Sequence, residues 1–144
     1  MHKIMEDIDK LTSIFKGYPY IAGVYLFGSY ARGKNTPNSD LDLAIIYKEG
    51  APSGRHLIHE EDYLAYRIGD ALNVKEVDII NFNRQGLVFQ HNVLKTGILI
   101  YDGDPSFRAR YIAGVLSAYC DFEITLRKYS RFYYEGIKRR LRSL

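Results

Sequence analysis

The sequence predicts an α/β (α+β) fold with a mixed β-sheet, helices packed on one face of that sheet, and a long C-terminal helix. Two observations predict the sheet. Residues 21–27 are rich in β-branched and aromatic side chains, and residues 41–47 form a near-continuous apolar run. The third observation predicts the helices, because apolar residues recur at spacings of three and four over residues 3–16, 56–72 and 104–142.

Glycine and proline set the boundaries of these elements. The first helix ends at Gly17 and Pro19, and the first strand ends at Gly28. After the strand at 41–47, a loop at 49–54 leads to the helix at 56–72 and to a third strand at 76–82. A short helix at 85–95 and a strand at 98–101 precede the final helix, which Asp104 caps and Pro105 begins.

Length and composition indicate one folded unit. The 144 residues suit a single domain, 1–144, with a core over about 1–102 and a helical arm over about 104–142. The sequence contains no apolar run of about 18 residues, the length needed to cross a membrane. The charged N-terminal residues do not resemble a secretory signal. The single cysteine, Cys120, fits a reducing compartment. We therefore expect a cytoplasmic protein.

Charge is divided unevenly along the chain. Residues 127–144 hold seven Lys and Arg against one Asp or Glu, whereas residues 1–126 are slightly acidic. Such a basic tail suits either an acidic partner or nucleic acid, although a solvated helix face has the same composition.

Two carboxylates, Asp40 and Asp42, stand two residues apart where the second strand begins. Strand side chains repeat every second residue, so both project from the same face and can hold a hard cation between them. An isolated Asp-x-Asp is more often a cap or a solvated turn. The glycine turn upstream supports a cation site over these alternatives. Gly28 permits a ligand to approach the backbone closely. The N–H groups from Ser29 onward, which we expect to enter a short helix, suit a phosphate.

Asp78 is the candidate third carboxylate. It alternates with apolar Val77 and Ile79, so it can emerge on the same sheet face as the other two. Three carboxylates would hold the two divalent ions that bridge nucleophile and leaving group in nucleotidyl transfer.

The runs GSYARG, SDLDLAI and VDII together resemble the minimal nucleotidyltransferases, single-domain relatives of polymerase β and the kanamycin nucleotidyltransferases. The resemblance covers most of residues 20–102. It implies that Gly28 and Ser29 hold phosphate and that Asp40, Asp42 and Asp78 bind metal and act in catalysis. Arg32 also matches the family pattern, and either contacts the triphosphate or braces the loop.

The antitoxins encoded beside HEPN-domain RNase toxins are the subgroup that the motifs resemble most closely. This resemblance implies ATP as donor, two Mg²⁺ ions, a HEPN toxin as partner, and transfer of AMP to a toxin tyrosine. Two alternatives remain open: transfer to a small-molecule hydroxyl, as in aminoglycoside modification, and an antitoxin that acts by binding and occlusion alone.

The C-terminal helix is the expected partner-binding arm. If it were straight, its roughly 39 residues would span on the order of 58 Å, beyond a compact domain of this size. It carries an apolar stripe that would serve either as core or as an interface, and basic residues flank that stripe. The flanks favour an acidic protein surface, and direct nucleic-acid binding is disfavoured because no recognised RNA-binding module accompanies them. The stripe comprises Tyr119, Phe122, Leu126, Tyr129, Tyr133, Ile137 and Leu141.

Overall fold

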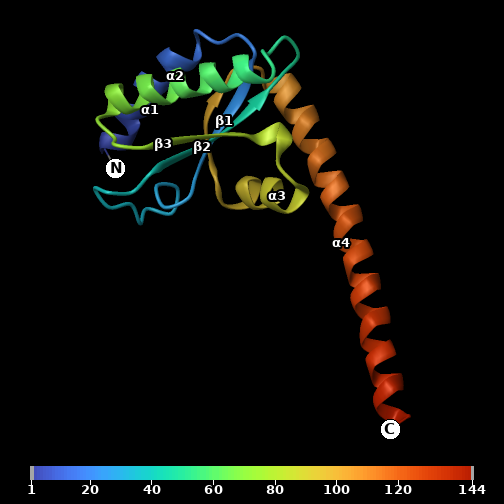
Figure 1. The fold of residues 1–144 in the computed structure, drawn as a ribbon. Helices are drawn as coiled ribbons and strands as arrows, with labels where there is room; N and C mark the ends of the chain where they lie inside the picture. Colours follow the sequence, from blue (N-terminus) through green and yellow to red (C-terminus); the bar gives the residue numbers. More distant parts are fainter. Residues whose placement is uncertain (1, 144) are drawn as a thin grey trace.

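The computed structural model describes residues 2–143 and contains a four-stranded mixed sheet in the order β3-β2-β1-β4 (Figure 1). The strands are β1 (Ile21–Phe27), β2 (Leu41–Tyr47), β3 (Val77–Asn81) and β4 (Ile98–Asp102). β1 pairs antiparallel with β2 and β4, while β2 pairs parallel with β3. The predicted fold class is therefore confirmed, and the two apolar runs form the two central strands.

Helices cover both faces of the sheet, which corrects the expectation that they lie on one. α1 (His2–Phe15) and α2 (Arg55–Leu72) pack on the face that carries Leu43 and Ile45. α3 (Leu87–Thr96) and the first turns of α4 (Pro105–Arg142) pack on the face that carries Ala44 and Ile46. Strand side chains alternate between faces, so an apolar run without alternation requires cover on both sides.

The parallel pairing of β2 with β3 requires a crossover, and α2 supplies it. α2 ends at Asn73, whose φ of 55° is left-handed, and its backbone N–H caps the helix on the carbonyl of Gly69. A single 3₁₀ turn, η1 (Phe82–Arg84), follows β3 and buries Phe82 completely. This turn was not predicted from the sequence.

α4 runs unbroken for 38 residues, about 57 Å at 1.5 Å per residue, and leaves the body of the molecule (Figure 1). Asp104 caps it by accepting a hydrogen bond of 3.1 Å from the N–H of Phe107, and it also pairs with Lys48 at 3.1 Å. These bonds lower the pKa of Asp104. Val115 is the last buried residue of the helix. Within residues 2–143, no helix combines the length and the apolar character needed to cross a bilayer.

Candidate functional site

The candidate carboxylates lie at the end of the sheet where β1 finishes and β2 and β3 begin. Asp42 is paired with Phe27 on β1 and with Asp78 on β3, so the three residues form a row across three strands. Paired residues share a sheet face, and this is the face on which α3 packs. Asp40 directly precedes β2. The fold thus brings together two carboxylates that are 36 residues apart in the sequence.

The electrostatics of this row favour a bound cation. Burial raises the pKa of the Asp42 carboxyl above its usual 3.8, and the negative charges of Asp78 and then Asp40 raise it further. A hydrogen bond to Asp78 acts in the same direction. No ion pair within residues 2–143 involves any of the three carboxylates. Mutual repulsion without a basic partner is relieved by a hard divalent cation with oxygen ligands, so the residues present fit Mg²⁺.

The three carboxylates lie near one another but do not form a complete metal-binding site. Across the part of the chain that the structure describes, no three His, Cys, Asp or Glu side chains converge in the geometry of a metal site. Asp78 is exposed, while Asp40 and Asp42 are half-buried. The side chains therefore have the freedom to adjust around an ion.

Gly28 forms the turn directly above Asp42, with a left-handed φ of 74°. A Cβ on this residue would lie 3.2 Å from Cγ of Asp42 and would collide with the carboxylate oxygen Oδ2. Only glycine can adopt this positive φ and also lie this close to the Asp42 carboxylate. The turn therefore passes so close to the Asp42 carboxylate that no room is left for a side chain at position 28.

The segment after Gly28 consists of hydrogen-bonded turns and not of the short helix that we expected. The N–H of Arg32 donates to the carbonyl of Gly28 at 3.2 Å, and the N–H of Lys34 donates to that of Ser29 at 2.9 Å. Within residues 2–143, the N–H groups of residues 29–31 donate to no backbone carbonyl. These N–H groups are available to an anion, as the sequence interpretation requires.

Arg32 lines a cavity of about 290 Å³ between the Gly28 turn and α3, which we call the Gly28–α3 pocket. Its other lining residues come from the end of β1 and from one face of α3, and they are Phe27, Gly28, Phe89, Asn92, Val93 and Thr96. The lining residues from α3 were not predicted from the sequence. Their spacing of three and four along a helix was visible, but only the tertiary structure places that face beside the glycine turn.

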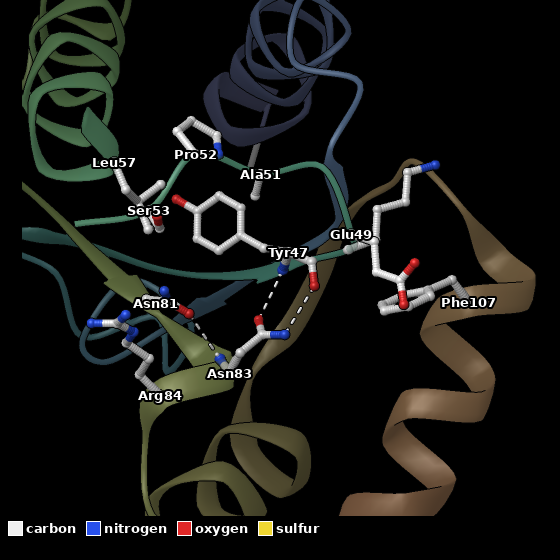
Figure 2. A pocket seen from close by; sticks show the side chains of 11 residues that line it. Tyr47, Glu49, Ala51, Pro52, Ser53, Leu57, Asn81, Asn83, Arg84 and Phe107 are labelled. Carbon is white, nitrogen blue, oxygen red and sulfur yellow. Dashed lines mark hydrogen bonds between the residues drawn. The ribbon is translucent and has the colours of Figure 1, made fainter. Parts of the chain in front are cut away.

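A larger pocket of about 350 Å³ lies at the other end of β2, around Tyr47 (Figure 2). Tyr47 lies five positions after Asp42, which is roughly 17 Å along a strand. Two polar side chains of this pocket, those of Asn81 and Asn83, are engaged in local hydrogen bonds. The Asn83 amide binds both the N–H and the carbonyl of Tyr47, at 2.8 and 2.9 Å, and Asn81 accepts from the N–H of Asn83. The carboxylate end of the sheet is therefore the candidate functional site.

Comparison with known proteins identifies a matching family and a related protein. Residues 9–106 match the family described as polymerase beta nucleotidyltransferase. Protein adenylyltransferase MntA of Aphanizomenon flos-aquae is 30% identical over 58% of this chain, and the match spans only 59% of that protein's length.

Two solved structures share the fold. A toxin–antitoxin complex with AMP-PNP has a chain with a TM-score of 0.64 and 22% identity, covering 80% of this chain and 88% of that chain. The second is a complex of the tri-AMPylated Shewanella oneidensis HEPN toxin with an MNT antitoxin. It has a chain with a TM-score of 0.60 and 19% identity, and the match covers 82% of this chain and 87% of that chain.

Proposed function

The chain belongs to the polymerase β nucleotidyltransferase family, and on that basis we propose that it is a Mg²⁺-dependent protein adenylyltransferase acting as the antitoxin of a HEPN toxin. It would transfer AMP from ATP to a tyrosine hydroxyl of that toxin and so neutralise it. The observation that carries the proposal is the row of Asp42 and Asp78 beneath the Gly28 turn. A cytoplasmic location fits both the use of ATP and the free thiol of Cys120.

In the proposed reaction, Gly28 and Ser29 bind the β- and γ-phosphates through backbone N–H groups and the Ser29 hydroxyl. Arg32 adds a positive charge beside the same turn. Asp40, Asp42 and Asp78 would hold two Mg²⁺ ions, which supply charge neutralisation for the triphosphate and for the departing pyrophosphate. The sheet fixes Asp42 and Asp78 opposite each other, so the metal ligands are positioned by a rigid element.

The bond changes are those of nucleotidyl transfer. The acceptor oxygen forms a bond to the α-phosphorus, the bond from that phosphorus to the β-bridging oxygen breaks, and pyrophosphate leaves. Asp78 is exposed beside the pair and is the carboxylate available to accept the proton of the acceptor hydroxyl. A phenol, with an ordinary pKa of about 10, requires such a base at neutral pH.

The partner would bind along α4. Beyond Tyr119, which is half-buried and stacks on His91, this helix displays its apolar stripe to solvent, with Tyr129 and Tyr133 each 71% exposed and Leu141 64% exposed. Such a length of exposed apolar and aromatic surface supports an interaction site on this helix. The basic flanks, among them Arg127, favour a partner with an acidic rim around an apolar groove.

Incubation of the chain and its HEPN partner with labelled ATP and Mg²⁺ tests the proposal. We expect label on the toxin, pyrophosphate release, and loss of both when Mg²⁺ is removed by EDTA. Neutralisation of the toxin by a variant without transfer activity would instead support occlusion alone. Label on neither partner in the presence of Mg²⁺ would contradict the proposed activity.

A further inference from the structure

The Gly28–α3 pocket lies on the same face of the sheet as the carboxylates. Phe27, which lines the pocket, is paired with Asp42 across β1 and β2, and paired residues on antiparallel strands direct their side chains to the same face. Gly28 contributes to the pocket wall, and a side chain at this position would collide with the Asp42 carboxylate. A molecule that bound phosphate at the glycine turn would therefore have this cavity beside it.

The lining of the pocket is partly aromatic and partly polar. The rings of Phe27 and Phe89 pack edge to face, with centroids 5.5 Å apart and an angle of 89° between their planes. Thr96 is already engaged, because its hydroxyl donates to the carbonyl of Asn92 at 2.7 Å. The side-chain amide of Asn92 makes no hydrogen bond within residues 2–143, and this side chain is exposed. Apart from the Arg32 guanidinium, which the proposed function assigns to the phosphates, the pocket thus offers apolar ring surface and one amide with a donor side and an acceptor side.

We propose that the Gly28–α3 pocket receives the nucleobase of the donor nucleotide and that Asn92 selects adenine over guanine. This inference rests on the proposed function and adds the residue that reads the base. A cavity of about 290 Å³ is at the lower end of the range for small-molecule sites, which suits a base with part of its ribose. Phosphates at the Gly28 turn and a base against Phe89 would place the α-phosphate next to the carboxylate row.

Complementary hydrogen bonding explains the selectivity. The N6–N7 edge of adenine presents one donor and one acceptor, which match the amide oxygen and amide nitrogen of asparagine. Guanine presents two acceptors, O6 and N7, at the corresponding edge. The amide oxygen of Asn92 would then face an acceptor, so guanine would lose one of the two bonds.

Direct binding measurements on the isolated chain test this inference. Calorimetry with ATP, GTP and 7-deaza-ATP, each with Mg²⁺, separates the base edge from the phosphates. The wild type should bind ATP more tightly than GTP or 7-deaza-ATP, by on the order of tenfold for a bidentate contact. Asn92→Leu, which keeps the branched side-chain shape and removes its hydrogen-bonding groups, should weaken ATP binding and remove both preferences.

Two further variants separate selectivity from general binding. Phe89→Ala should weaken ATP and GTP binding by similar factors, because ring surface contacts either base. Val88→Ala, at an exposed position of the same helix outside the pocket, should leave all three affinities unchanged. Circular dichroism checks that each variant is folded.

The outcomes distinguish this inference from the proposed function. Equal binding of ATP and GTP by the wild type, or an unchanged preference in Asn92→Leu, would overturn the role of Asn92, while Mg²⁺-dependent transfer to the toxin would still support the proposed function. Failure of the folded wild type to bind any of the three nucleotides would overturn both.

Discussion

Gly28 lies so close to Asp42 that any side chain at position 28 would collide with the carboxylate. A Cβ built on Gly28 would lie 3.2 Å from Cγ of Asp42, and the backbone φ there is 74°. The conformation of the glycine turn and the position of the Asp42 carboxylate therefore depend on each other. A side chain at position 28 would displace the Asp42 carboxylate.

Substitution at position 28 should be more harmful than substitution at position 29. We expect Gly28→Val to raise the KM for ATP at least about tenfold, because a β-branched residue is strained at positive φ by roughly 1–2 kcal/mol and would displace the carboxylate. Ser29→Ala removes a hydroxyl and leaves the N–H donors, so an effect of about two- to tenfold is expected. Steady-state kinetics with varied ATP provides the comparison. Equal, small effects would reduce the motif to a structural turn.

Asp40→Asn combined with Asp42→Asn should abolish nucleotide transfer and preserve the fold. The change keeps side-chain shape and removes the charge that would bind Mg²⁺, so we expect a rate at least about a hundredfold lower. Label transfer from ATP measures the rate, and a thermal melt measures the fold. Asp70→Asn on α2, outside the site, is a suitable control for loss of a carboxylate. A wild-type rate in the double variant would refute the metal assignment.

Stability without metal should depend on the ionisation of Asp42. Its pKa in the folded chain is raised above 3.8, so the ionised form is less favourable in the folded than in the unfolded chain. The associated stabilisation is present below the unfolded pKa and is lost as pH rises through the folded pKa. In EDTA at neutral pH, Asp42→Asn should therefore melt at a higher temperature than the wild type.

Mg²⁺ provides the check on this stability prediction. It should raise the melting temperature of the wild type at neutral pH and have little effect on Asp42→Asn, because the ion relieves the same repulsion that the amide removes. Equal melting temperatures in EDTA, together with equal responses to Mg²⁺, would contradict the repulsion between Asp42 and its two neighbours.

The α4 stripe should be dispensable for folding and required for association. Tyr129 and Tyr133 are each 71% exposed and Ile137 is 38% exposed, so replacing all three by Ser removes little buried surface. We expect a circular dichroism spectrum close to that of the wild type, with loss of co-purification with the HEPN partner. A matched control is Ile58→Ser on α2, which is 59% exposed but lies outside the stripe. Retained binding would place the interface elsewhere.

Local sequence determined most of the elements of this protein. The runs 21–27 and 41–47 are strands at those bounds, since a β-branched, apolar run bordered by glycine or a loop has few alternatives. Asp104 and Pro105 fixed the start of α4 for a similarly local reason. The Asp-x-Asp spacing was also sufficient to place Asp40 and Asp42 at one strand end, because alternation along a strand is a property of the backbone.

The tertiary structure alone decided what surrounds those residues. The register of β2 against β3 places Asp78 opposite Asp42, and a shift of one residue would have turned Asp78 to the other face. The two-sided cover of the sheet and the position of Phe89 and Asn92 beside Gly28 likewise depend on how α3 returns across the sheet. The sequence predicted the overhang of α4 only as one of two outcomes. Whether an apolar stripe becomes core or surface depends on what else is near enough to cover it. Within residues 2–143, His91 stacks on Tyr119, and the rest of the stripe, from Phe122 to Leu141, is exposed.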